Sequence, residues 1–241
     1  MFSRRSRATF EPNRLTQALE EARTRGAPLA DLTSGNPTTA AIEYDPRVER
    51  ALSPAGPVRY EPAPFGDPRA RRAIAELWAE RGVTVRSDDV IVTASTSEAY
   101  AFAFKLLCDP GDEILVPAPS YPLIEHLAAL DSVSLVRYPL VYESGFSIDL
   151  ASLRRSVSER TRAIVLVSPN NPTGSYVKRG ELAALGELGL PLVSDEVFAE
   201  YALSSDDERA RSVLEESRVL VVALDGLSKL AALPHVKLAW M

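Results

Sequence analysis

Short apolar runs and amphipathic helical stretches alternate along the chain from about residue 68 onward. The apolar runs are rich in β-branched residues and too short for helices, so they predict buried strands. These strands are expected at Val90–Thr93, Glu113–Val116, Ser134–Arg137, Ala163–Val167, Pro191–Ser194 and Val219–Ala223. Helical patterns fill most of the gaps, for example at Glu98–Leu107, Leu150–Val157 and Arg179–Leu188. Apolar strands alternating with helices predict an α/β fold in three layers, with a mostly parallel sheet and helices on both faces.

The beginning of the chain follows a different pattern. A helix is expected over Asn13–Arg25, ended by Gly26, and the turn-rich sequence LTSGNPT follows it. The Pro-rich segment 54–68 also contains aromatic residues, and we interpret it as an ordered loop. Asp67 and Pro68 are typical of an N-cap and a first helical turn, and Gly82 is expected to end that helix.

Polar or aromatic residues follow nearly every predicted strand. In a parallel α/β sheet, ligands bind in the crevice at the carboxyl ends of the strands. The sequences at those ends are ASTS (94–97), PAPSYP (117–122), SPNNPTG (168–174), Asp195 and LDGLSK (224–229). We therefore expect one cleft that all of these segments face.

Composition removes several classes of function. The formal net charge is -6, which argues against nucleic-acid binding, because a phosphate backbone requires a basic surface. Cys108 is the only cysteine, which favours a reducing compartment. No apolar run is long enough for a bilayer span, so a cytoplasmic location without a membrane partner is expected. His126 and His235 are far apart in the sequence, so no metal site is expected.

Each candidate at the strand ends has an ordinary explanation and a functional one. Thr96 and Ser97 open a helix, where they either cap it or bind an anion. Asp195 either caps the next segment or pairs with a ligand, since a buried carboxylate is costly when unpaired. A lysine such as Lys229 is usually a solvated surface residue, but a lysine in a closed site can form a Schiff base. Asn170 and Asn171 either make a turn or present an amide to a ligand.

Taken together, these segments resemble the class I/II aminotransferase family of fold-type I pyridoxal-phosphate-dependent enzymes. The similarity is carried by SPNNPTG, SDEVF and LSK in this order, with LPHVKLAW after them. It extends to SGNP, YEPAPFGDPRARRAI, TASTSEAYAFAFKLL and PGDEILVPAPSYP, and so covers nearly the whole chain. The resemblance implies pyridoxal 5'-phosphate as cofactor and an amino acid and a 2-oxo acid as substrates.

The resemblance also implies roles for single residues. Lys229 is implied to form the Schiff base and to act as general base, and Asp195 to keep the pyridine nitrogen protonated. Asn171 is implied to donate to the phenolic oxygen of the ring, and Tyr121 to stack on the ring. The implied phosphate ligands are Thr96, Ser97, Ser228 and, from the neighbouring subunit of a homodimer, Tyr60. Gly35 and Asn36 are implied to border the substrate, together with Asn171.

Two positions depart from the family pattern. Phe198 stands where the family usually has a tyrosine that supports the phenolic oxygen, so the pKa of the Schiff base is expected to rise. Lys237 stands where the family normally has a phosphate-binding arginine, and lysine keeps the charge but loses bidentate geometry. Neither change removes an atom that the chemistry requires.

The resemblance implies a division into an N-terminal arm with part of a small domain (residues 1–45) and a cofactor-binding large domain (residues 46–241). The family's C-terminal small domain, which normally supplies an arginine for the substrate carboxylate, is expected to be absent. Aminotransferase activity is the favoured prediction. The alternatives are a truncated, catalytically weak or non-catalytic cofactor-binding domain, and a pyridoxal-phosphate-dependent lyase on the same scaffold.

Overall fold

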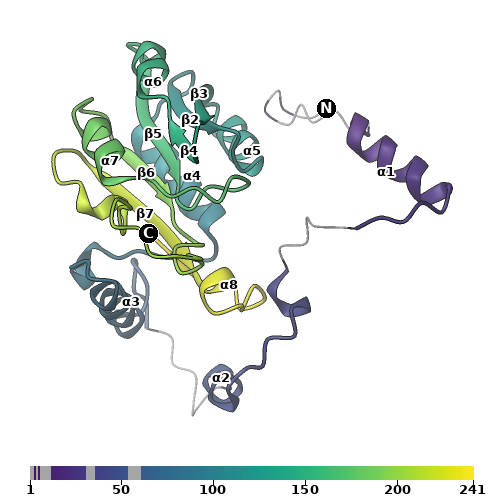
Figure 1. Ribbon diagram of the computed structural model, residues 1–241. Coiled ribbons are helices and arrows are strands. Elements are labelled where there is room, and N and C mark those ends of the chain that lie inside the picture. Colours follow the sequence, from purple (N-terminus) through teal and green to yellow (C-terminus); the bar gives the residue numbers. More distant parts are fainter. Residues whose placement is uncertain (1–2, 4, 6–11, 31–35, 54–60) are drawn as a thin grey trace.

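The protein is built around one mixed β-sheet (Figure 1). The computed structural model describes residues 3, 5, 12–30, 36–53 and 61–241. Among these residues the strands follow the spatial order β1-β8-β7-β6-β5-β2-β3-β4. Their bounds are β1 Val92–Thr93, β2 Glu113–Ala118, β3 Ser134–Tyr142, β4 Phe146–Ile148, β5 Thr161–Val167, β6 Leu192–Asp195, β7 Val221–Gly226 and β8 Ala239–Trp240.

The centre of the sheet is parallel, as the sequence predicts. Strands β7, β6, β5, β2 and β3 run in the same direction. At one edge β4 pairs antiparallel with β3, and near the other edge β8 lies antiparallel to both β7 and β1. All the predicted strands are present with shifted ends, whereas β4 and β8 were not predicted. The parallel centre brings the carboxyl ends of β2, β5, β6 and β7 to one side of the sheet.

The helices are α1 Arg14–Thr24, α2 Pro46–Leu52, α3 Pro68–Glu80, α4 Thr96–Leu107, α5 Leu123–Leu130, α6 Leu150–Ser156, α7 Arg179–Gly186 and α8 Leu227–Leu230. Short 3-10 turns lie at η2 Pro37–Thr39, η3 Ser87–Asp89 and η4 Val213–Glu215. The predicted start of α3 is confirmed, because the Asp67 carboxylate accepts the N–H of Arg69 at 2.7 Å. Its predicted end is confirmed as well, since Gly82 adopts a left-handed φ of 77° just beyond the helix.

The core consists of two apolar clusters, one on each face of the sheet. Alternate residues of a strand point to opposite faces. Accordingly Val193 packs with α4 and α5, whereas its neighbour Leu192 packs with α6 and α7. Fully burying one such side chain stabilises the fold by about 1.5–3 kcal/mol. The predicted α/β class, with a mostly parallel sheet and helices on both faces, is therefore confirmed.

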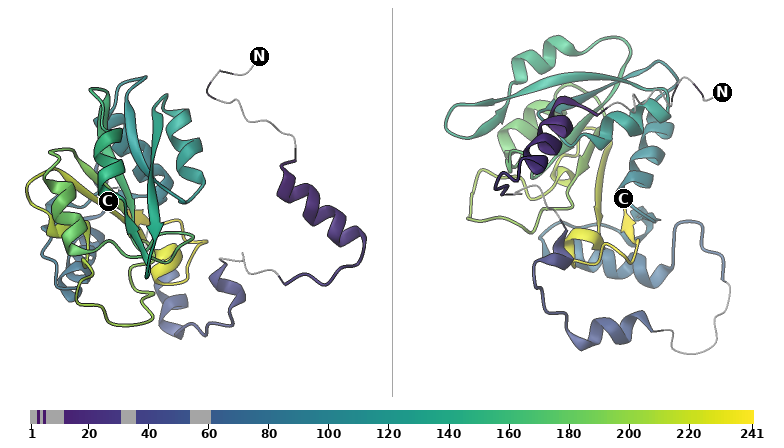
Figure 2. Two further views of the ribbon diagram at one scale, coloured as in Figure 1. Left: turned by 45° about the horizontal axis from the view of Figure 1, so that its top comes forward. Right: turned by 90° about the vertical axis from the view of Figure 1, so that its right-hand side faces the viewer.

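The N-terminal segment lies outside this core. Helices α1 and α2 contain no buried residue, and α1 lies away from the sheet in Figure 1 and in the left-hand view of Figure 2. One tie to the body is the hydroxyl of Tyr44, which donates to the carbonyl of Ala232 at 2.5 Å. The interpretation of 54–68 as an ordered loop falls partly outside the described residues, since these resume at residue 61. The division at residue 45 stays a prediction.

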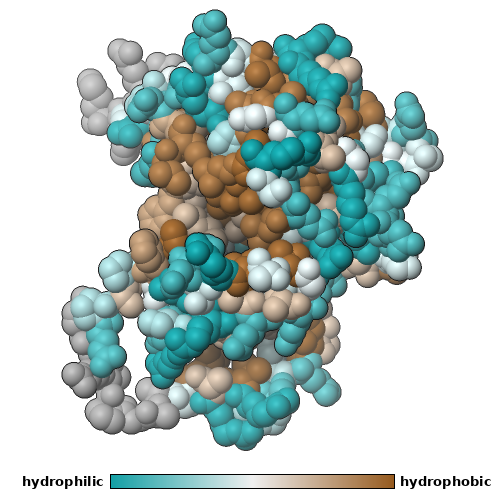
Figure 3. All heavy atoms as spheres, turned by 90° about the vertical axis from the view of Figure 1, so that its left-hand side faces the viewer, coloured by the Kyte–Doolittle hydropathy of each residue, from teal (hydrophilic) through white to brown (hydrophobic). Residues whose placement is uncertain are grey.

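The surface is largely hydrophilic on the side shown in Figure 3, with hydrophobic residues gathered near its middle. An apolar groove runs along β7, lined on one side by Val221–Ala223 and on the other by Val90 and Ile91. It exists because β8 is only two residues long, so among the described strands Val221–Ala223 pair on the β6 side alone. Within the described part of the chain, no helix is both long and apolar enough to span a membrane.

Candidate functional site

Asp195 is the last residue of β6, in the middle of the parallel sheet. Its cross-strand neighbours are Val167 on β5 and Leu224 on β7. The residue is only 6% exposed, and its carboxylate accepts one long hydrogen bond, from the N–H of Val197 at 3.3 Å. Burial raises the pKa of Asp195 to about 6, while the bond from Val197 partly offsets this rise. A buried carboxyl with so few donors can accept a further N–H or a cation.

Tyr100 faces Asp195 from helix α4. Asp195 points to the same face of the sheet as Val193, which packs in the cluster that contains Tyr100. The Tyr100 hydroxyl lowers the pKa of the carboxyl, yet it has no hydrogen bond of normal geometry to any described residue. The two groups are thus close without forming a standard hydrogen bond.

The amino end of α4 is open for an anion. The cap is Ser95, whose side chain accepts the N–H of Glu98 at 3.2 Å, while the Glu98 carboxylate accepts the N–H of Ala94 at 2.7 Å. The capping explanation for Thr96 and Ser97 is therefore wrong, because their neighbour fills that position. Within the described residues neither of these two hydroxyls forms a hydrogen bond, and the first two N–H groups of a helix lack partners inside it. Such an end attracts negative charge.

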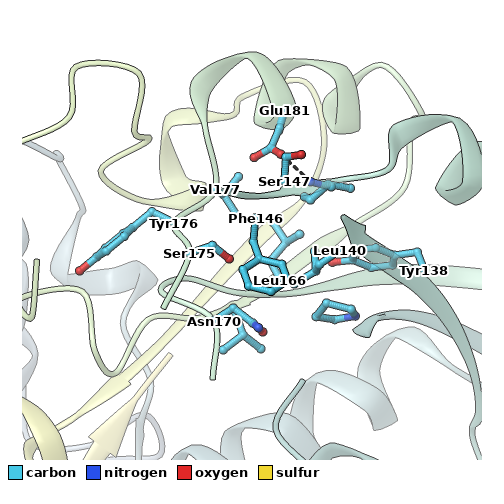
Figure 4. Close-up of a pocket in the computed structure, with 13 residues that line it drawn as sticks. Tyr138, Leu140, Phe146, Ser147, Leu166, Asn170, Ser175, Tyr176, Val177 and Glu181 are labelled. Carbon is cyan, nitrogen blue, oxygen red and sulfur yellow. Dashed lines mark hydrogen bonds between the residues drawn. The ribbon is translucent and has the colours of Figure 1, made fainter. Parts of the chain in front are cut away.

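The SPNNPTG loop follows β5 and contains cis peptide bonds before Pro169 and Pro172. Asn170 is buried and holds the loop together, since its amide donates to the carbonyl of Pro119 at 3.2 Å and to the Thr173 hydroxyl at 2.9 Å. Asn170 lies along a small pocket that Leu140, Phe146 and Leu166 also line, while the ring of Tyr176 points away (Figure 4).

These contacts distinguish the roles of the two asparagines in the loop. The amide of Asn170 is occupied in holding the loop, whereas Asn171 is exposed on the turn. Asn170 also links this loop to the loop that carries Tyr121.

Lys229 lies on the short helix α8, directly after β7. Its ammonium nitrogen is 5.6 Å from the ring centroid of Phe198, and its carbonyl accepts the hydroxyl of Tyr201 at 2.8 Å. The rings of Phe198 and Tyr201 meet edge to face with centroids 5.5 Å apart. A side chain at Gly226 would place its Cβ 2.8 Å from that of Ala239. Glycine there permits the close approach of β8 to the end of β7.

The remaining predicted residues have fewer contacts with the residues described above. Tyr121 is 40% exposed, but its hydroxyl is near enough to contribute to the raised pKa of Tyr100. Ser228 is half-buried beside Lys229, and Lys237 is exposed with a left-handed φ of 56°. Asn36 accepts hydrogen bonds from Thr38, and no hydrogen bond between described residues ties its side chain to the strand ends. Gly35 and Tyr60 lie outside the described residues.

Sequence reasoning missed Tyr100 and did not assign a role to Tyr201. Tyr100 is four residues after Thr96, which puts both on one face of α4, so a helical count from the anion site could have found it. Tyr201 follows Phe198 by three residues, but its bond to the Lys229 carbonyl depends on how α8 packs. The structure thus places Asp195, Lys229 and the amino end of α4 at the carboxyl ends of the strands. It brings Phe198 and Tyr201 to Lys229, and Tyr100 to Asp195.

Comparisons with known proteins point to one family. The family model described as "Aminotransferase class I and II" matches residues 28–241. A probable aspartate/prephenate aminotransferase of Thermus aquaticus is 36% identical over 183 residues, covering 74% of this chain and 48% of the relative. Nicotianamine aminotransferase 1 of Oryza sativa subsp. japonica is 31% identical over 224 residues, covering 89% of this chain and 45% of the relative.

Solved structures show the same likeness. An alanine aminotransferase from Pyrococcus furiosus superimposes with a TM-score of 0.82 at 27% identity, covering 100% of this chain and 63% of that protein. The chain spans about half the length of the curated relatives that it matches. The family match extends over most of the chain, and it includes every strand end described above. The chain therefore belongs to the class I and II aminotransferase family.

Proposed function

We propose that the protein acts as a pyridoxal-phosphate-dependent aminotransferase on an amino acid and a 2-oxo acid. The observation that supports the proposal is the placement of three groups at the carboxyl ends of the strands. A buried carboxyl lies at the end of β6, a lysine follows the neighbouring β7, and an open helix start follows β1. Because the chain spans about half the length of the relatives, the activity of a whole protein of this family is part of the proposal.

The residues present fit pyridoxal 5'-phosphate. The cofactor has an anionic phosphate, a ring nitrogen that can carry a proton, and an aldehyde that reacts with amines. The open start of α4 suits the phosphate, with the hydroxyls of Thr96 and Ser97 as further donors. The under-partnered carboxyl of Asp195 suits a protonated ring nitrogen, because an adjacent positive charge offsets the cost of its burial. Lys229 supplies the amine.

When bound, the cofactor supplies an electron sink for the bond that is broken at the α-carbon of the amino acid. The protein's residues then have distinct tasks. Asp195 holds the proton on the ring nitrogen, and the Lys229 amine attaches the cofactor and afterwards moves the α-proton. Asn171 and Tyr121 are proposed to contact the ring, and Ser228 and Lys237 to support the phosphate.

Tyr201 does not replace the hydroxyl that is missing at Phe198. Its hydroxyl donates to the main-chain carbonyl of Lys229, so the aromatic pair holds the lysine helix in place. The ammonium of Lys229 lies over the ring of Phe198, so the contact is a cation–π interaction rather than a hydrogen bond. We propose that Phe198 and Tyr201 position Lys229 in this protein.

The substrate is proposed only at the level of its class. The names of the relatives include aspartate/prephenate, nicotianamine and tyrosine aminotransferases, and what these names share is transfer of an amino group. The homodimer, the partner role of Tyr60, the substrate contacts of Gly35 and Asn36, and the cytoplasmic location also stay predictions.

The test is a half-reaction with the 241-residue chain. The chain is loaded with pyridoxal 5'-phosphate, freed of excess cofactor and mixed with single amino acids, while absorbance and 2-oxo acid release are followed. A band that shifts with at least one amino acid, with one 2-oxo acid formed per bound cofactor, supports the proposal. A band that stays unchanged with every amino acid favours a binding domain, and release of ammonia favours a lyase. The variant Lys229→Ala serves as the control that should give no shift.

A further inference from the structure

The hydroxyl of Tyr100 is a buried polar group that the proposed mechanism does not use. The residue is 2% exposed on α4, and its hydroxyl has no hydrogen-bond partner among the described residues. Buried hydroxyls in proteins are nearly always hydrogen-bonded. Tyr138, also fully buried, follows this rule, since its hydroxyl donates to the carbonyl of Val165 at 2.8 Å. Tyr100 therefore calls for an explanation.

The packing of Tyr100 places its ring next to Asp195. Val167 and Leu224, the cross-strand neighbours of Asp195, belong to the same buried cluster as Tyr100. Strand alternation directs the Asp195 side chain toward this cluster rather than toward the opposite face. Because Tyr100 lies one helical turn after Thr96, α4 carries the open anion site and this tyrosine on one stripe.

The electrostatics of the two residues agree with this geometry. The Tyr100 hydroxyl lowers the pKa of Asp195, as does the N–H of Val197, whereas burial and the nearby carboxyl of Asp225 raise it. Burial raises the pKa of Tyr100 well above its ordinary value, so the phenol keeps its proton and can only act as a donor toward a carboxylate. A donor that favours the ionised form of Asp195 would also fix the orientation of its oxygens.

We propose that Tyr100 is a positioning residue that donates a hydrogen bond to the ionised Asp195 and leaves the other carboxylate oxygen facing the ligand. A small rotation of either side chain completes the bond. The last part of this inference rests on the proposed function, because the ligand group that meets Asp195 is the ring nitrogen of the cofactor. The bond between Tyr100 and Asp195 itself concerns the cofactor-free protein and can be tested there.

The first test compares Tyr100→Phe with the matched control Tyr138→Phe in the cofactor-free chain. The titration of Asp195 is followed by NMR of ¹³C-labelled aspartate, with its signal assigned from the Asp195→Asn variant. The pKa of Asp195 should rise above about 6 in Tyr100→Phe, by roughly one unit, and stay unchanged in Tyr138→Phe. An unchanged pKa in Tyr100→Phe, or an equal rise in both variants, would overturn the proposal.

A second measurement avoids the substitution of Tyr100 and so remains decisive if that variant does not fold. Tyrosine labelled at Cζ reports the environment of the phenol, and the Tyr100 signal should move as the pH passes through the titration of Asp195. In Asp195→Asn that movement should vanish. A Tyr100 chemical shift that stays constant while Asp195 titrates would contradict the inference. Both tests hold whether or not the chain binds pyridoxal 5'-phosphate, so a failed aminotransferase assay is distinguishable from a failed role of Tyr100.

Discussion

Asp195 shows at the scale of a single residue how position and burial create a binding group. The end of β6 places its carboxyl inside the protein, where one long hydrogen bond, from Val197, is the only one of normal geometry that it accepts from a described residue. The resulting rise of its pKa to about 6 measures how poorly water and protein stabilise the charge. A cationic ligand group would restore that stabilisation. The energetic cost of burying the Asp195 carboxylate therefore favours binding of such a group.

Replacing Asp195 by asparagine should therefore separate stability from chemistry. At pH 8 the cofactor-free variant should be more stable than the parent by up to about 3 kcal/mol, because a buried charge is removed. The half-reaction should slow by ~10²-fold or more, since the ring nitrogen loses its electrostatic partner. Urea unfolding and single-turnover absorbance measure the two effects. The control is Asp112→Asn, which breaks an ion pair with Arg162 at the amino ends of β2 and β5 and should leave the rate unchanged.

The hydroxyl of Tyr201 is the second residue-scale case. Tyr201→Phe removes the hydrogen bond to the Lys229 carbonyl and keeps the ring that packs on Phe198. Loss of one such bond is worth about 1 kcal/mol, so attachment of pyridoxal 5'-phosphate to Lys229 should slow by roughly fivefold. Stopped-flow absorbance after mixing with cofactor measures this rate. Tyr142→Phe, on an exposed hairpin residue, is the control, and equal rates in all three proteins would reject the positioning role.

Residues at strand ends could be proposed from the sequence because a simple topological rule applies to them. Asp195 directly follows an apolar run and Lys229 lies shortly after another, and a parallel sheet brings the ends of such runs to one side. The roles of Tyr100 and Tyr201 could not be proposed in this way. Each meets its partner from another element, so the contact depends on how a helix or a turn packs on the sheet.

At the scale of an element, the start of helix α4 is the most informative. Ser95 caps it and Glu98 completes the cap, which leaves Thr96 and Ser97 available for another ligand. Elsewhere the same local chemistry has a purely structural role, as at Asp67 on α3. These two helix starts therefore form a natural comparison.

Ser95→Ala and Asp67→Ala should have the same effect on stability and different effects on cofactor binding. Either change removes an N-cap and should cost about 1 kcal/mol of unfolding free energy. Ser95→Ala should also weaken binding of pyridoxal 5'-phosphate severalfold, because the first turn that carries the phosphate donors frays. Asp67→Ala should leave the affinity unchanged. Urea unfolding measures the stability of the two variants, and fluorescence titration measures their affinity for the cofactor. Equal cofactor affinities of Ser95→Ala and Asp67→Ala would argue against a phosphate site on α4.

Element boundaries also show why some predictions succeeded. The long apolar runs of β2 and β5 and the helix starts with clear caps could be located because local signals agree there. Helix α5 was not named from the sequence, and its N-cap residue, Pro122, makes no side-chain cap hydrogen bond. Strands β4 and β8 span three and two residues, and they exist only because longer strands lie beside them. Such elements are set by tertiary pairing rather than by local sequence.

At the scale of the whole molecule, three buried carboxyls set the dependence of stability on pH. Desolvation raises the pKa of Asp195 to about 6, of Glu196 to about 7 and of Asp225 to about 6. For these groups the folded state binds protons more tightly than the unfolded state. Their contribution to stability is therefore present at low pH and is lost as the pH rises through the folded pKa values.

The cofactor-free protein should thus become less stable as the pH rises from about 4 to about 7, by up to about 3 kcal/mol per carboxyl. Below pH 4 the direction reverses, because arginine contacts hold the pKa of Asp67 and of Glu216 near 2. Urea unfolding at pH 5, 6 and 7.5 measures the trend. Glu196→Gln, a change at a carboxyl outside the proposed site, should reduce the slope of stability against pH, because one of the three carboxyls is removed. Stability that increases steadily from pH 5 to 7.5 would contradict this assignment.

The central claim is that Lys229 carries pyridoxal 5'-phosphate at the carboxyl edge of the sheet, and reductive trapping tests it most directly. The loaded 241-residue chain is reduced with borohydride, digested and mapped by mass spectrometry. The other lysines, Lys105, Lys178 and Lys237, serve as internal controls in the same sample. The account predicts a stoichiometric label on Lys229, traces on the other three lysines, and loss of that label when an amino acid is added before reduction. A label spread evenly over the lysines, or one that persists at another position in Lys229→Ala with equal yield, would contradict it.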